Sequence, residues 1–121
     1  MAGVTDWAFR TICAELGANL TVTEMVSSRA LVYKDKKSAA LLRKNEGSVC
    51  GAQIFGNDPE IMAQGAQLAL EISGCDFLDI NMGCPLVKEI VFNPLYILAS
   101  FVKDKVSICA CRGATFLCLV R

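Results

Sequence analysis

The sequence predicts an α/β fold in which helices alternate with the strands of a parallel sheet. Apolar residues recur at helical spacing from Thr5 onward, and short apolar segments typical of strands follow with brief connections. A hydrophobic content of 54% with only 20% charged residues, over 121 residues, is enough for one small domain with a core. This alternation is typical of βα units around a parallel sheet.

The first third of the chain is predicted to form a helix, a strand and a second short helix. Residues 5–16 begin with Thr-Asp, a helix-start signal, and end before a glycine. Residues 20–24 alternate and are rich in β-branched side chains, which favours a strand. Residues 34–37 form a charged run, expected as a solvated loop or helix start, with a basic groove for RNA as the alternative. Helical spacing resumes over residues 38–43.

The middle of the chain is predicted to form a strand, a helix and another strand. Residues 49–56 are almost uniformly apolar, as in strands of a parallel sheet that is covered on both faces. Residues 57–59, Asn-Asp-Pro, are a helix-start signal with proline in the first turn. Helical spacing continues to residue 72, and residues 76–80 follow as the next strand.

The last part of the chain is less regular. Residues 86–93 are predicted to be a loop, and Asn-Pro at 93–94 is expected to cap a short helix over residues 95–102. Residues 106–111 are predicted to be a strand. Residues 113–121 are an apolar tail without a clear stop signal, and an exposed strand is expected there.

Polar residues stand at or near the carboxyl ends of three predicted strands. Glu24 ends the first, Gln53 interrupts the second, and Asn81 follows the third. Parallel sheets bind their ligands at the carboxyl ends of the strands, so we expect these side chains to lie at one edge. A buried Gln53 amide needs hydrogen-bond partners, which either the backbone or a ligand provides.

Cys84 is the candidate catalytic residue. Gly83 allows a tight turn and Pro85 restricts the backbone that follows, so the thiol is expected on a stiff loop after a strand. A thiol in that position can act as an acid or as a nucleophile. The alternative is a structural role, because free cysteines are often small core residues.

Charge and cysteine content argue against several functions. Twelve basic residues balance twelve acidic ones and histidine is absent, so the totals show no electrostatic footprint for nucleic acid or membrane. The first residues do not resemble a secretory leader, so the seven cysteines indicate a reducing cytoplasmic compartment. Cys109 and Cys111 are too close together for a zinc hook, and no metal site is predicted. No apolar run reaches the length of about 18 residues that a membrane span needs, and no nucleotide-binding glycine motif is present.

Four segments together resemble the tRNA-dihydrouridine synthase family. They are Met-Ala-Gly-Val-Thr-Asp-x-x-Phe-Arg at 1–10, Thr-Glu-Met at 23–25, Gln-Ile-Phe-Gly-x-Asp-Pro at 53–59 and Asp-Ile-Asn-Met-Gly-Cys-Pro at 79–85. Their order and spacing agree with the family across about residues 1–92. Residues 93–121 depart from the family's pattern.

This resemblance implies an α/β fold of the (β/α)8 TIM-barrel type. Residues 1–121 would be a partial flavin-binding domain, the N-terminal half of the barrel with parallel strands. FMN would be the cofactor, NADPH the electron donor and tRNA the substrate, in which a uridine is reduced to 5,6-dihydrouridine. The resemblance also implies the site residues: Met1 and Ala2 for backbone contact with FMN, Gln53 for a hydrogen bond to the flavin ring, Asn81 facing flavin and uracil, and Cys84 as proton donor.

The implied chemistry suits these residue types. Hydride addition at C6 of uracil leaves negative charge at C5, which an acid must then protonate. A thiol with the ordinary pKa of about 8.5 is mostly protonated at neutral pH and can serve as that acid. The base must leave its stack to reach a flavin, so a flipped-out loop nucleotide is the expected target.

The chain is about half of a barrel of roughly 250 residues, so we expect an incomplete and inactive piece that binds FMN weakly or not at all.

Two other functions stay open. One alternative is a non-catalytic remnant that binds a partner or dimerises through exposed strand edges. The other is a related flavin barrel that reduces free pyrimidines, although the first and third segments favour the tRNA enzyme.

Overall fold

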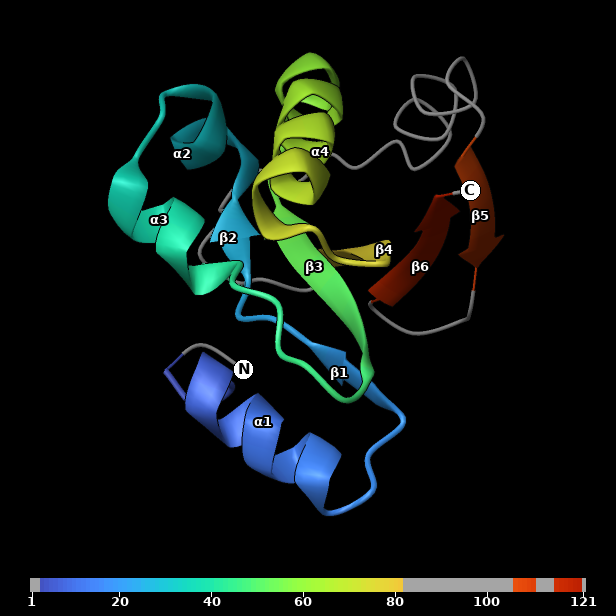
Figure 1. Ribbon diagram of the computed structural model, residues 1–121. Helices are drawn as coiled ribbons and strands as arrows, with labels where there is room; N and C mark the ends of the chain where they lie inside the picture. Colours follow the sequence, from blue (N-terminus) through green and yellow to red (C-terminus); the bar gives the residue numbers. More distant parts are fainter. Residues whose placement is uncertain (1–2, 82–105, 111–114, 121) are drawn as a thin grey trace.

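A sheet with helices packed on one face forms the core of this computed structural model, which describes residues 3–81, 106–110 and 115–120. Its mixed α/β fold with parallel strands confirms the class predicted from the sequence (Figure 1). The helices are α1 (Trp7–Glu15), α2 (Ser28–Val32), α3 (Lys36–Leu41) and α4 (Pro59–Ser73). The strands are β1 (Leu20–Val22), β2 (Val26–Ser27), β3 (Val49–Phe55), β4 (Phe77–Asn81), β5 (Val106–Ala110) and β6 (Thr115–Val120).

The sheet has the order β1-β3-β4-β6-β5, and β2 also pairs with β3. Strands β1, β3 and β4 are parallel, with Leu20 opposite Val49 and Gly51 opposite Phe77. Parallel neighbours need a long crossover connection, and helices provide it here. Helices α2 and α3 lie between β2 and β3 in the chain, and α4 lies between β3 and β4.

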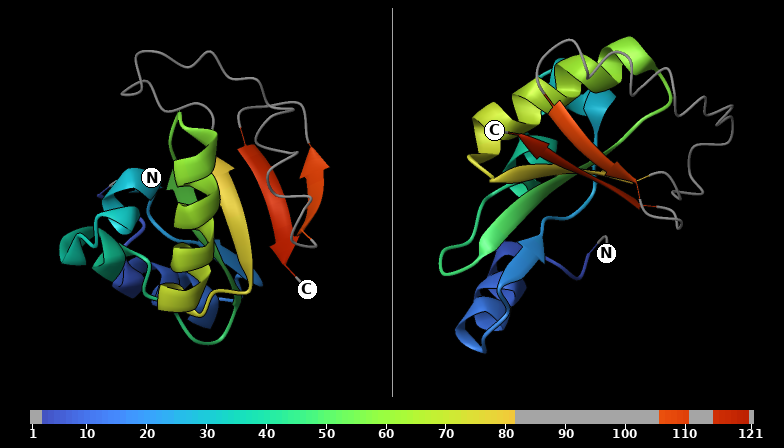
Figure 2. Two further views of the ribbon diagram at one scale, coloured as in Figure 1. Left: turned by 90° about the horizontal axis from the view of Figure 1, so that it is seen from above. Right: turned by 90° about the vertical axis from the view of Figure 1, so that its right-hand side faces the viewer.

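The parallel arrangement ends at β4. Strand β6 runs antiparallel to β4, with Asn81 opposite Thr115, and β5 runs antiparallel to β6. The 111–114 connection is too short for a parallel crossover, so the two strands pair as an antiparallel hairpin. The strand expected at 106–111 is confirmed, and the apolar tail forms a strand inside the sheet order, between β4 and β5 (Figure 2).

The strand predicted over residues 20–24 ends at Val22, and a second short strand, β2, follows after a break. At the break, the Thr23 hydroxyl accepts the backbone N–H of Gln53 at 3.0 Å. A side chain therefore replaces a backbone carbonyl as the partner of β3. Pairing resumes at β2, where Val26 lies opposite Ile54.

The two longer helices begin and end as their local sequence predicts. In α1 the Asp6 carboxylate accepts the N–H of Phe9 at 2.8 Å. In α4 the Asp58 carboxylate accepts two N–H groups of the first turn, and Gly74 ends the helix with a left-handed φ of 63°. These caps involve residues that are close in sequence, which explains why the sequence reveals them.

Helices α2 and α3 differ from the prediction. Helix α3 starts at Lys36 rather than at residue 38, because the Asp35 carboxylate accepts the Ser38 N–H at 3.0 Å. The charged run at 34–37 is thus a helix start. Helix α2 was not predicted, and its five residues pack against α4, where a Cβ on Gly65 would collide with Ser28. Such a short helix depends on tertiary contacts rather than on its own propensity.

The core lies between α4 and one face of β3 and β4 (Figure 2). Alternate side chains of the two strands enter it, among them Ala52 and Ile54 from β3 and Leu78 and Ile80 from β4. Because successive side chains of a strand point to opposite faces, the intervening positions of β3 and β4 lie on the face away from α4. This second face carries the polar residues of the candidate site.

Helix α1 leaves its apolar residues largely exposed. It packs beside β1 at the end of the sheet (Figure 1), while Phe9, Ile12 and Leu16 are 45%, 55% and 84% exposed. The predicted apolar face of this helix is therefore present, but the part of the chain that the structure describes does not cover it. None of the described helices has the length and hydrophobicity required to cross a membrane.

Candidate functional site

Gln53 and Asn81 lie side by side on the face of the sheet that is turned away from α4. Gln53 is on β3 and Asn81 ends the neighbouring strand β4. The Asn81 side-chain N–H donates to Gln53 Oε1 at 3.4 Å, and both residues are half-buried. The structure therefore brings together two of the residues that the sequence singled out.

Asp79 joins this pair, and the sequence analysis did not assign it to the site. Gln53 Nε2 donates a hydrogen bond to Asp79 Oδ2. The Gln53 side chain thus has hydrogen-bond partners in two neighbouring side chains. A single carboxyl inside the apolar segment 77–81 was the signal that could have identified Asp79.

Burial dominates the electrostatics of Asp79. The residue is only 2% exposed, and among the described residues its Oδ1 atom has no hydrogen-bond partner. Desolvation raises the pKa of Asp79, and the hydrogen bond from Gln53 opposes this effect. A buried carboxyl with a raised pKa and an unused oxygen is able to bind a proton or a donor group at this place.

The connection between β1 and β2 also reaches the site. The Asn81 side-chain N–H lies 3.8 Å from the sulfur of Met25, and the Thr23 hydroxyl holds the backbone of Gln53. Residues from the second, third and fourth family-like segments therefore meet at one place. This convergence agrees with the expectation that the strand ends share one edge.

Glu24 ties the start of the chain to the end of β1. It is 8% exposed, and its carboxylate accepts the backbone N–H of Gly3 at 2.6 Å. Met1 and Ala2, which precede Gly3, lie outside the described residues, and so does Cys84. Their predicted roles stay predictions.

A small hollow lies near this edge but does not include the site residues. Its volume is about 170 Å³, and it opens where β2 and β3 end and α4 begins. Its lining residues are Ser27, Ser28, Arg29, Phe55, Gly56, Asn57, Asp58 and Ile61. The hydrogen-bonded side chains, rather than this hollow, therefore define the candidate site. Within the described ranges no three His, Cys, Asp or Glu side chains are grouped so that they could hold a metal ion.

Parallel strands with polar side chains near their carboxyl ends define an α/β protein whose candidate site lies on the sheet. Residues 1–91 match the family described as dihydrouridine synthase (Dus). The chain belongs to the dihydrouridine synthase family, which confirms the resemblance found in the sequence.

Curated relatives carry the name tRNA-dihydrouridine synthase B. The protein of Escherichia coli (strain K12) is 47% identical over 89 residues, which are 73% of this chain and 27% of that protein. Those of Shewanella oneidensis and Vibrio vulnificus are 48% and 44% identical over the same length and shares. The chain thus spans about a quarter of the length of these relatives.

Proposed function

We propose that this chain carries part of the active site of an FMN-dependent tRNA-dihydrouridine synthase, which reduces uridine in tRNA to 5,6-dihydrouridine with NADPH. The main support is the hydrogen-bonded chain Asp79–Gln53–Asn81, because its members come from two of the family-like segments. The names of the relatives supply the tRNA substrate of the proposal. A cytoplasmic location, where tRNA is modified, belongs to the same proposal.

The side chains of Gln53 and Asp79 fit the ring end of a flavin. Because Asp79 accepts from Gln53 Nε2, the amide is held with its oxygen toward Asn81. The Nε2 atom carries a second hydrogen, which suits an acceptor on a flavin ring. FMN, when bound, supplies the hydride for uracil C6.

In this proposal Cys84 and Asn81 act on the uracil. Cys84 delivers its thiol proton to C5, and Asn81 orients the base through its amide. Cys84 follows Asn81 by three residues in the sequence, so the proposed proton donor and the residue that orients the base are close along the chain. Met1 and Ala2 would contact FMN through their backbone, and the bond between Gly3 and Glu24 supports this by holding the next residue at the end of β1.

The proposal includes the (β/α)8 barrel as the architecture of the whole enzyme. Its support is the consecutive parallel order of β1, β3 and β4, with α4 as a crossover helix. In such barrels the site lies at the carboxyl ends of the strands. Gln53 and Asn81 occupy late positions in β3 and β4, as the barrel requires.

A graft tests the proposed site separately from the length of the chain. Residues 1–91 replace the matching segment of the E. coli synthase, and dihydrouridine in tRNA is measured in cells without their own synthases. We expect the graft to form dihydrouridine, the same graft with Cys84→Ala to lose it, and the graft with Cys13→Ala to keep it. A folded graft without product, or an active Cys84→Ala form, would contradict the proposal. Activity on free uracil instead of tRNA would favour the pyrimidine-reducing alternative.

One observation favours a second candidate function, a module that self-associates. The exposed apolar residues of α1, such as Ile12 and Leu16, are of the kind that protein interfaces bury. Light scattering on the isolated chain separates the two cases. Dimers that Leu16→Gln disrupts support the second candidate, and a monomer that stays monodisperse contradicts it.

A further inference from the structure

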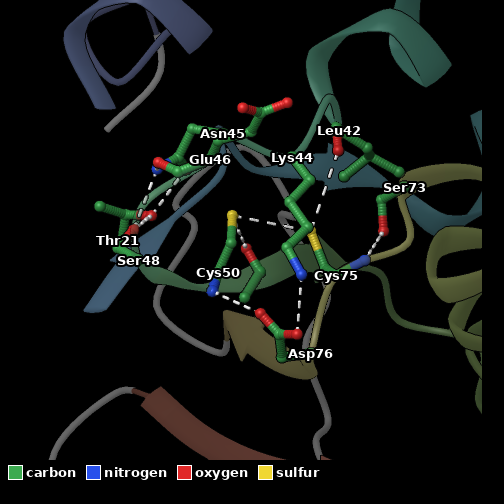
Figure 3. Close-up of polar contacts among 11 residues, drawn as sticks. Thr21, Leu42, Lys44, Asn45, Glu46, Ser48, Cys50, Ser73, Cys75 and Asp76 are labelled. Atoms are coloured by element: carbon green, nitrogen blue, oxygen red, sulfur yellow. Dashed lines mark hydrogen bonds and ion pairs between the residues drawn. The ribbon is translucent and has the colours of Figure 1, made fainter. Parts of the chain in front are cut away.

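Cys50 and Cys75 form a close pair of thiols away from the candidate site. Cys50 stands near the start of β3 and is fully buried, whereas Cys75 lies in the turn before β4 and is half-buried. Their sulfur atoms are 3.7 Å apart and face each other (Figure 3). Because Gln53 and Asn81 lie further along the same two strands, the thiols are at the opposite end of the strand pair.

Asp76, which follows Cys75 in the chain, makes two hydrogen bonds to the backbone of Cys50. Its Oδ2 accepts the N–H of Cys50 at 2.8 Å, and its own N–H donates to the Cys50 carbonyl at 2.8 Å. Lys44 binds the other carboxylate oxygen at 2.8 Å (Figure 3). The N–H of Cys75 donates to the Ser73 hydroxyl at 3.0 Å. The two cysteines are therefore presented to each other by a network that does not depend on their own sulfurs.

The two thiols are chemically unequal. Cys75 donates its thiol hydrogen toward the Cys50 sulfur, with the Leu42 carbonyl as a second acceptor at 4.0 Å. This hydrogen bond lowers the pKa of Cys50 and raises the pKa of Cys75. The thiolate is the reactive form of cysteine, so Cys50 is the nucleophile of the pair and Cys75 the resolving thiol.

We propose that Cys50 and Cys75 are an oxidation site at which a peroxide forms an intramolecular disulfide between β3 and the turn that leads into β4. The β3–β4 register, continued by one residue, sets Cys50 opposite Asp76, so Cys75 is the direct neighbour of the residue that faces Cys50. The sulfurs must approach from 3.7 Å to about 2 Å, which a side-chain rotation of half-buried Cys75 provides. Cys50 is fully buried, so the proposal requires hydrogen peroxide to enter past half-buried Cys75.

The reaction proceeds in two balanced steps. The Cys50 thiolate attacks one oxygen of hydrogen peroxide, so an S–O bond forms, the O–O bond breaks, and the released hydroxide takes a proton to become water. The Cys75 sulfur then attacks Cys50 Sγ; the S–S bond forms, the S–O bond breaks, and hydroxide leaves with the Cys75 proton as water. In sum, two thiols and one peroxide give a disulfide and two waters, and the two sulfurs lose the two electrons that the peroxide gains.

The resulting bond would join the starts of two neighbouring strands without touching their site residues. It would close the segment 50–75, which contains all of α4. Closing a loop of this length restricts the unfolded chain and stabilises the fold. Oxidation is therefore expected to raise the midpoint of thermal unfolding, and a reductant is expected to reverse the change.

Peptide mapping of the full chain tests the proposal directly. The folded protein is treated with hydrogen peroxide, the peroxide is removed, the remaining thiols are alkylated in denaturant at neutral pH, and the chain is cleaved before its aspartates. Cleavage of this sequence separates Cys50 on fragment 35–57, Cys75 on fragment 58–75 and Cys84 on fragment 79–103. We expect fragments 35–57 and 58–75 to become linked, with the loss of both thiol hydrogens, and to separate again on reduction.

Two serine variants form a matched control, because Cys13 and Cys75 are both half-buried. In Cys75→Ser the link disappears and sulfenic acid accumulates on Cys50, where dimedone labels it. In Cys13→Ser the link forms as in the parent chain. The proposal is overturned if the folded parent chain, after peroxide, carries alkylated thiols on both fragments, or if Cys50 links to another cysteine in preference to Cys75.

Discussion

The side-chain amide of Gln53 connects a buried carboxyl to the end of the next strand, since it donates to Asp79 and accepts from Asn81 at 3.4 Å. This arrangement determines which end of the amide faces which neighbour. It also leaves one oxygen of a buried carboxyl without a partner among the described residues. The consequences for pH and stability are measurable in the chain itself.

Asp79→Asn is expected to change how stability depends on pH. The pKa of Asp79 is raised in the folded protein, so its contribution is fully present below the unfolded pKa of about 3.9 and is lost as pH rises through the folded pKa. Asparagine does not titrate. Above pH 4 the variant should therefore become more stable relative to the parent. The difference in the free energy of unfolding should grow by about 1.4 kcal/mol per unit of pKa shift. Urea unfolding between pH 3 and pH 8 measures the difference, and a flat difference would contradict the prediction.

Asp35→Asn is a control of opposite sign. Hydrogen bonds from the Ser38 hydroxyl and backbone lower the pKa of the exposed Asp35 carboxyl. Its contribution is therefore present above the unfolded pKa and is lost as pH falls through the folded pKa. Asparagine also caps helices, so the fold should survive the change. The free energy of unfolding of the parent should therefore increase relative to that of this variant as pH rises through the folded pKa of Asp35.

Gly65→Ala in α4 is expected to destabilise the protein, although alanine favours helices over glycine by about 1 kcal/mol. A Cβ at this position would meet the side chain and backbone of Ser28 in α2, at 2.6 and 2.9 Å. Overpacking of this kind costs about 1–3 kcal/mol. Thermal or urea unfolding gives the change in free energy. Gln67→Ala, at an exposed position of the same helix, is the control and should be neutral or slightly stabilising.

The two partners in the Lys44–Asp76 ion pair should differ in importance. Asp76→Ala removes the acceptor for the N–H of buried Cys50 and is expected to cost about 1–3 kcal/mol of unfolding free energy. Lys44→Ala removes only a partly exposed ion pair and should cost no more than about 0.5 kcal/mol. Equal losses in denaturant unfolding would mean that the ion pair, rather than the hydrogen bond, holds this turn.

The isolated chain is expected to bind FMN weakly or not at all. It contains the proposed ring-facing residues Gln53 and Asn81, yet it spans only 27% of the length of the E. coli relative. Quenching of flavin fluorescence during titration with the chain measures the affinity. Purified protein that is yellow, with a bound flavin in its absorption spectrum, would contradict this prediction.

Local sequence signals predicted α1, α4 and the strand pair β3 and β4. Asp58 and Gly74 mark the ends of α4 because their side chain or backbone acts within one turn of the helix. The apolar segment of β3 reports the burial of one face, on which Cys50, Ala52 and Ile54 are completely buried. On the other face Gln53 and Phe55 are half-buried, so the expected cover of both faces is not met by the described residues. Helix α2 escaped prediction because its stability comes from packing against α4.

The candidate site was only partly predictable for a related reason. Gln53 stands out in the sequence because it interrupts an apolar strand, and Asn81 because it follows one. Asp79 became part of the site only when the register set Gln53 opposite Asp79. Pairing partners of this kind are distant in sequence, so no local pattern reports them.

By itself the sequence determined the family of this protein, its alternating helices and strands, and the polar residues at its strand ends, because those signals arise from neighbours along the chain. Only the tertiary structure decided that β6 pairs antiparallel with β4, that Asp79 supports Gln53, and that the Cys50 and Cys75 sulfurs meet. The physical reason is that strand register joins residues far apart in sequence. Their contacts follow from how the strands align, and the identity of the residues alone does not specify that alignment.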